Sequence, residues 1–152
     1  EAYSWYFYDM EAEKMVIPPD TSLNAIETIL DRHIPEGHST IPKLIVGFSQ
    51  GGFLAPMLAH RLPHTKELVT VGTGYRPEYY HALPPLTVTA VHGTADEVFP
   101  SDDAIKAHQS ILDLGHRGQF HAIRDVGHIA TEAMGTIVHQ QLVQLLGTGG
   151  AP

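Results

Sequence analysis

A serine stands in the middle of the pattern Gly47-Phe48-Ser49-Gln50-Gly51, directly after an apolar run. The pattern fits G-x-S-x-G, the nucleophile elbow, in which a sharp turn between a strand and a helix presents a serine hydroxyl. The turn crowds the residues two before and two after the serine, and glycine at both positions avoids a collision because it has no Cβ. The helix that follows would direct its N–H groups and positive dipole end toward the serine. Ser49 is therefore a candidate nucleophile.

Two further loops carry candidates for the groups that such a nucleophile needs. A serine hydroxyl attacks well when an imidazole takes its proton, and a carboxylate behind the imidazole holds the correct tautomer. Asp96 follows an apolar run at 86–92, and His128 follows another at 120–123. The chain order Ser49, Asp96, His128 predicts a nucleophile, an orienting acid and a general base.

Other acidic residues and histidines fit structural roles better. Asp102 and Asp103 stand where helix-capping acids are expected, and Asp125 is too close in sequence to His128 for the usual triad geometry. The remaining histidines weighed for the base lie in predicted strands or helices: His92 and His121 in strands, His108 and His139 in helices.

A metal site is not expected. His60 and His64 are four residues apart, a spacing that could suit a metal ion. Pro63 interrupts the helix that would align them, and no third ligand is evident. The sequence predicts neither a metal nor a cofactor.

Length and composition predict one globular domain over residues 1–152, with 43% hydrophobic and 17% charged residues. The net charge of −8 argues against a nucleic-acid partner. No apolar run approaches membrane-spanning length, and the absence of cysteine excludes disulfides and thiolate chemistry. Nothing near Glu1 resembles a signal peptide, which favours a cytoplasmic location.

Apolar periodicity predicts helices that alternate with strands. The first helix follows the possible caps Asp20-Thr21-Ser22 and ends by Ile34, because Pro35 and Gly37 interrupt it. The later expected elements are, in order, a strand at 43–48, a helix at about 53–62 containing Pro56, a strand at 67–71, an irregular loop at 75–85, a strand at 86–92, a helix at about 101–115, a strand at 120–123, and a helix at about 129–146.

This order predicts a doubly wound α/β sheet with flanking helices. In such sheets ligands bind beyond the carboxyl ends of the strands. Ser49, Asp96 and His128 each follow a strand, so all three are expected on the same rim. The aromatic residues at 3–8 predict an edge strand, an extended segment packed on the core, or a lining for the substrate pocket.

Several stretches resemble the phospholipase/carboxylesterase family of α/β-hydrolases, whose members include acyl-protein thioesterases and small bacterial esterases. They are GFSQGG at 47–52, HGTADEVFP at 92–100 and Gly127-His128. Ser4-Trp5-Tyr6 is also similar to a Ser-Trp-aromatic segment that precedes the nucleophile strand in the family.

The resemblance implies an α/β-hydrolase-like fold with a mostly parallel sheet and a small ester or thioester as substrate. It implies Ser49, Asp96 and His128 as the catalytic triad and the N–H of Gln50 as one oxyanion donor. Trp5 and Phe48 are the residues expected to border the substrate.

One departure from the family concerns the segment before Ser4. A full family member carries further strands there and a His-Gly-rich loop that supplies a second oxyanion N–H, whereas no His-Gly pair precedes Ser49 here. The fold is therefore expected to be N-terminally truncated, with about four core strands and half of the oxyanion hole. A missing donor costs about 10²–10³ in rate in enzymes of this kind.

Two functions follow from this departure. The first is a serine hydrolase that cleaves esters or thioesters through an acyl-enzyme. The alternative is a non-catalytic remnant that binds ligands or forms one part of a larger assembly. The strand Lys43–Phe48 is expected at a sheet edge, where a second copy or another polypeptide would pair with it.

Overall fold

The computed structural model describes residues 4–9, 11–12, 14–34 and 40–148. The chain divides into two compact units, Glu1–Ile41 and Pro42–Pro152. That both belong to one domain stays a prediction.

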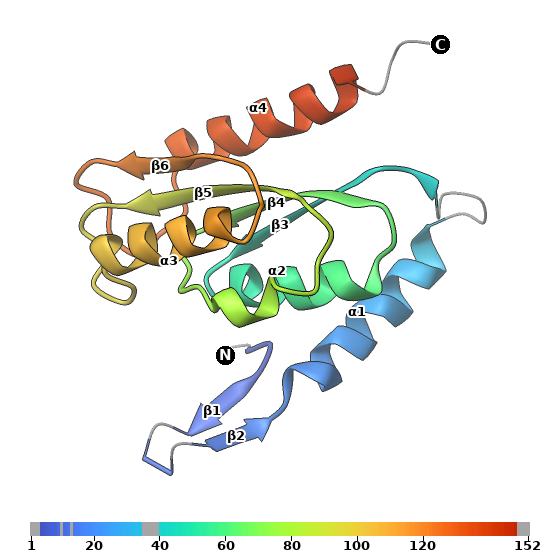
Figure 1. The fold of residues 1–152 in the computed structure, drawn as a ribbon. Helices are drawn as coiled ribbons and strands as arrows, with labels where there is room; N and C mark the ends of the chain where they lie inside the picture. The colour runs from blue at the N-terminus through green and yellow to red at the C-terminus, as the bar shows by residue number, and fades with distance from the viewer. Residues whose placement is uncertain (1–3, 10, 13, 35–39, 149–152) are drawn as a thin grey trace. The chain divides into compact units, whose positions relative to one another are not determined.

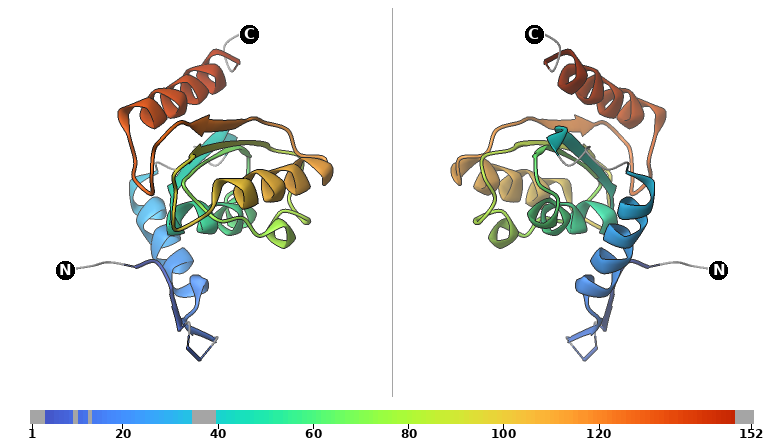
Figure 2. Two further views of the ribbon diagram at one scale, coloured as in Figure 1. Left: turned by 90° about the vertical axis from the view of Figure 1, so that its left-hand side faces the viewer. Right: turned by 90° about the vertical axis from the view of Figure 1, so that its right-hand side faces the viewer.

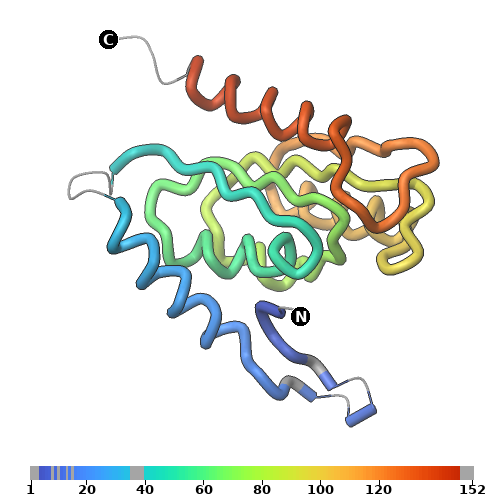
Figure 3. The backbone as a smooth tube through the Cα atoms, turned by 180° about the vertical axis from the view of Figure 1, so that it is seen from behind, coloured from blue at the N-terminus to red at the C-terminus, as the bar shows by residue number. Residues whose placement is uncertain are grey.

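The first unit is a hairpin followed by a helix (Figure 3). Strand β1 (Phe7–Asp9) pairs antiparallel with β2 (Lys14–Ile17), and helix α1 covers Pro19–His33. The predicted cap at Asp20–Ser22 is wrong, because α1 begins at Pro19. Proline suits the first turn, where its fixed φ is helical and its missing N–H has no partner to lose.

The second unit is built on a parallel sheet of four strands in the order β3-β4-β5-β6 (Figure 1). These strands are β3 (Lys43–Phe48), β4 (Thr65–Val71), β5 (Thr87–Gly93) and β6 (Phe120–Ile123). All neighbouring pairs are parallel, so the carboxyl ends of the strands meet at one rim. Among the described strands β3 pairs with β4 alone, which confirms its predicted edge position.

Helices cover both faces of this sheet. Helices α2 (Gln50–Arg61) and α3 (Ser101–Asp113) lie on one face and α4 (Glu132–Thr148) on the other (Figure 2). Helix α2 begins directly after Ser49 and continues past Pro56. The short 3₁₀ helix η2 (Pro77–Tyr79) interrupts the loop after β4.

The predicted start of the last helix at Ile129 is wrong by three residues. The N–H of Ile129 donates to the carbonyl of Gly127 at 2.9 Å, a tight turn that keeps this residue in the loop. The hydroxyl of Thr131 accepts the N–H of Met134 at 3.4 Å and so caps α4.

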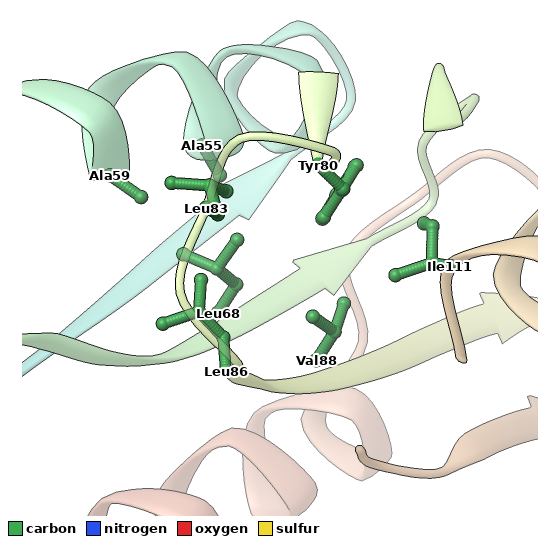
Figure 4. Packing of buried hydrophobic residues seen from close by; sticks show 8 residues of the cluster. All are labelled: Ala55, Ala59, Leu68, Tyr80, Leu83, Leu86, Val88 and Ile111. Carbon is green, nitrogen blue, oxygen red and sulfur yellow. The ribbon is translucent and has the colours of Figure 1, made fainter. Parts of the chain in front are cut away.

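Alternating side chains of the strands fill two cores. Leu68 and Val88 pack toward α2 and α3 with Tyr80 and Ile111 (Figure 4). Val69 and Val91 point to the other face and pack with Met134 of α4. Both faces of the central strands are therefore buried, as in other parallel sheets. No helix in the described part of the chain is long and apolar enough to cross a bilayer.

Candidate active site

Ser49 stands on a strained turn between β3 and α2. Its φ is 52° and its ψ −119°, a backbone conformation that L-residues rarely adopt. The N–H of Ser49 donates to the carbonyl of Val71 at 2.9 Å, which ties the turn to β4. A Cβ on Gly47 would lie 2.4 Å from the backbone carbon of Gly51. The turn therefore requires glycine at position 47, and it has the geometry of a nucleophile elbow.

A chain of hydrogen bonds joins the three residues predicted to act together. The Oγ of Ser49 lies 2.9 Å from Nε2 of His128, and Nδ1 of the same ring lies 2.9 Å from Oδ2 of Asp96. The ionised carboxylate can only accept, so Nδ1 carries the proton and donates it. Nε2 then presents a lone pair to the serine hydroxyl. This tautomer is the one that a general base needs.

The Asp96 side chain is fully buried, and its other oxygen is held by the backbone. Oδ1 accepts the N–H groups of Val98 and Phe99, each at 2.9 Å. Burial acts to raise the pKa of Asp96, but the N–H of Phe99, the imidazole of His128 and the N–H of Val98 outweigh it. The pKa of this carboxyl therefore lies below its usual range.

The loops that carry the acid and the base are tied to each other. The N–H of Ala95 donates to the carbonyl of Val126, and the N–H of Thr94 donates to that of Ile123, both at 2.9 Å. A Cβ on Gly93 would lie 2.1 Å from the carbonyl oxygen of Val126. Only glycine at position 93 permits this approach, so it helps to set the distance between the two loops.

The loop after β4 also touches the site. Gly72 has φ 51°, and a Cβ on it would lie 3.5 Å from Oδ2 of Asp96 and 3.6 Å from Nδ1 of His128. The hydroxyl of Thr73 donates to the carbonyl of Ser49 at 2.8 Å. No motif in the sequence predicts a role for Gly72 or Thr73 in the site. Their position after a strand, on the same rim as the other loops, was the available signal.

The other predicted site residues lie in different surroundings. Phe48 is 40% exposed and its ring centroid lies 5.2 Å from that of His128, so it borders the site. Gln50 is the first residue of α2, which places its N–H at the helix N-terminus beside Ser49. Trp5 belongs to the first unit. The roles of these three residues stay predictions.

The alternatives to the predicted acid lie elsewhere. Asp102 and Asp103 are exposed in the first turn of α3, and Asp125 is exposed in the loop after β6.

His60, weighed above as part of a metal site, bonds the backbone instead: its Nε2 lies 3.0 Å from the carbonyl oxygen of Tyr79. Within the described residues no group of three His, Asp or Glu side chains could hold a metal ion.

The sequence model of the phospholipase/carboxylesterase family matches residues 4–144. The chain belongs to this family. It is 25% identical over 144 residues to acyl-protein thioesterase 1 homolog 2 of Dictyostelium discoideum. The match covers 89% of this chain and 64% of that protein, so the chain spans less than two thirds of the length of this relative.

Solved structures of related proteins show the α/β-hydrolase fold in the chain. Esterase PE8 superposes with a TM-score of 0.74 at 24% identity, over 94% of this chain and 70% of that one. SOBER1 of Arabidopsis thaliana superposes with a TM-score of 0.70 at 19% identity, over 94% of this chain and 74% of SOBER1. The predicted fold class is thus confirmed, and the four parallel strands with helices on both faces are part of that fold.

Proposed function

We propose that the chain is a serine hydrolase that cleaves carboxylic ester or thioester bonds, with Ser49 as nucleophile, His128 as general base and Asp96 as the residue that orients it. The observation that supports this most is the hydrogen-bonded chain from Ser49 Oγ through the imidazole to Asp96, with both contacts at 2.9 Å. The name of the Dictyostelium discoideum relative, a thioesterase, favours a thioester among the substrates.

In the first half of the reaction, Ser49 Oγ attacks the carbonyl carbon of the substrate while Nε2 of His128 takes its proton. Asp96, held ionised by its lowered pKa, stabilises the imidazolium that forms. The negative charge on the former carbonyl oxygen develops beside the N-terminus of α2, where the N–H of Gln50 is the proposed donor. The tetrahedral intermediate then expels an alcohol or thiol, which receives the proton from His128.

The second half releases the acid. The acyl group is now an ester of Ser49, and a water molecule takes the place of the leaving group. His128 removes a proton from this water, which attacks the acyl carbon, and then returns the proton to the serine oxygen. The enzyme returns to its starting state with the acid as product.

Hydrolysis of p-nitrophenyl acetate by the purified chain tests the proposal. Ser49→Ala should reduce the rate to that of the buffer, because the nucleophile is gone, while the unfolding temperature stays within a few degrees. Ser110→Ala is the matched control, since Ser110 is exposed on α3 and its hydroxyl donates to the carbonyl of Lys106 in the same helix.

Two results would count against the proposal. Hydrolysis that survives in Ser49→Ala would remove this serine from the mechanism. A folded wild-type chain with no hydrolysis above buffer would favour the alternative, a family member that binds without catalysing.

A further inference from the structure

One buried histidine is not used by the proposed reaction. His92 lies on β5 next to Gly93, and its side chain is fully buried. Its ring stacks on Phe120 of β6 with centroids 6.0 Å apart and an interplanar angle of 28°. Strand β5 lies between β4 and β6 in the sheet, which fixes the backbone of His92. The ring of Phe120 fixes its side chain.

The ring of His92 makes a hydrogen bond to the loop that carries Asp96. Nε2 of His92 lies 2.8 Å from the carbonyl oxygen of Phe99. A carbonyl oxygen can only accept, so Nε2 carries the proton of the neutral ring. The same nitrogen lies 3.6 Å from Oδ2 of Asp96, beyond a normal hydrogen bond. Nδ1 is buried and has no hydrogen-bond partner among the residues that the structure describes.

Phe99 contacts both Asp96 and His128, the two residues that are hydrogen-bonded in line with Ser49. Its N–H donates to Oδ1 of Asp96 at 2.9 Å, and its ring centroid lies 5.6 Å from that of His128. The ring of Phe99 also lies against Gly74, where a Cβ would come within 2.8 Å of Cε1. A shift of Phe99 would therefore move the carboxylate and the imidazole together.

We propose that His92 is a positioning residue: its Nε2–H anchors the carbonyl of Phe99 to the rigid strand β5, and Phe99 in turn fixes Asp96 and His128 in line with Ser49. His92 touches no reacting atom in this scheme. Its effect reaches the reaction only through the Asp96–His128 hydrogen bond. The proposal rests on the function proposed above for these residues.

The matched pair His92→Gln and His92→Asn tests the proposal. Both place a neutral amide at the buried site, but the amide nitrogen of glutamine reaches about as far as Nε2, whereas that of asparagine falls short of the carbonyl. His92→Gln should keep kcat within about threefold of wild type. His92→Asn should lower kcat by up to about 10²-fold with little change in KM, as expected for misplaced catalytic groups. His121→Asn, on the neighbouring strand β6, is the control and should leave kcat unchanged.

A second readout does not depend on activity. The proton between Nδ1 of His128 and Asp96 should give a low-field imidazole signal in the proton NMR spectrum of the wild type. It should persist in His92→Gln and disappear or broaden in His92→Asn. If His92→Asn does not fold, as judged by circular dichroism, His92→Leu takes its place, since leucine also lacks the donor.

The outcomes separate the two proposals. An inactive wild type with the expected loss of the low-field signal in His92→Asn would contradict the proposed function and support the positioning role. Equal kcat values and equal low-field signals in the two folded variants would overturn the positioning role, even if the wild type is an active esterase.

Discussion

At the scale of single residues, the direction of each hydrogen bond fixes the protonation state of the site. His128 donates from Nδ1 to Asp96 and presents the lone pair of Nε2 to Ser49. A proton on Nε2 would remove this lone pair and with it the base. The pKa of Asp96 lies below its usual range, so its carboxylate stays charged throughout the range in which imidazoles titrate.

The rate of ester hydrolysis is therefore expected to fall as the pH is lowered. Protonation of His128 removes the base, so kcat/KM should fall on acidification and approach a drop of about tenfold for each pH unit on the acid limb of the profile. The pKa of Asp96 lies below its usual range, so protonation of this carboxyl should not contribute to the loss in the upper part of the profile. A pH–rate profile between pH 4.5 and 8.5 measures this.

Two variants test whether His128 is the base responsible for this pH dependence. His128→Ala should lower kcat by about 10³-fold or more, because the base is lost. His121→Ala should leave the rate and the profile unchanged, since His121 lies within β6 and is not a member of the hydrogen-bonded chain of Ser49, His128 and Asp96. Equal losses in both variants would show that the wrong histidine has been chosen.

At the scale of elements, the order of strands was sufficient to predict that three polar residues meet at one rim of the sheet. Ser49, Asp96 and His128 each follow a parallel strand, and parallel strands end on one rim, so their meeting could be inferred from local patterns alone. The double role of Phe99 could not be inferred in this way. It depends on the carbonyl that faces His92 and on a ring packed between distant loops, and no local pattern records such contacts.

Glycine shows the same limit. The need for glycine at position 47 could be predicted from the elbow motif, because a Cβ there would collide with Gly51, only four residues along the chain. Gly72 and Gly93 are constrained by Phe48 and by Val126, residues that are brought close only by the folded sheet. The starts of α1 and α4 were missed for a related reason, because the use of Pro19 as the first helical residue and of Thr131 as a cap depends on where the preceding loop ends.

The edge strand β3 is expected to pair with another chain. It pairs with β4 alone among the described strands, and Val46 on it is 48% exposed. An apolar strand at the edge of a sheet favours pairing with another chain. Light scattering after size exclusion should give a mass above the 16.6 kDa of one chain, rising with concentration.

A charged residue on the edge tests this expectation. Val46→Lys should shift the mass toward that of one chain, because lysine on an edge strand opposes pairing. Ile105→Lys is the matched control: Ile105 is 44% exposed on α3, and this variant should associate as the wild type does. A wild-type monomer in which the amides of residues 44–48 exchange slowly would contradict the expectation.

At the scale of the whole molecule, every member of the proposed triad comes from the second unit, Pro42–Pro152. The family match extends over residues 4–144, and the chain spans 64% of the length of the Dictyostelium discoideum relative. The oxyanion donor proposed in this chain is the N–H of Gln50. Loss of a second donor would slow the reaction by about 10²–10³ without removing the nucleophile or its base.

The central claim is that Ser49 in this chain is a nucleophile activated by His128. The most direct test is to treat the purified 152-residue chain with a fluorophosphonate and to map the adduct by mass spectrometry of its peptides. We predict one adduct per chain, on the peptide that contains Ser49, formed at least about 10²-fold more slowly in His128→Ala. No adduct on the folded chain, an adduct on another residue, or an equal rate in His128→Ala would contradict the claim.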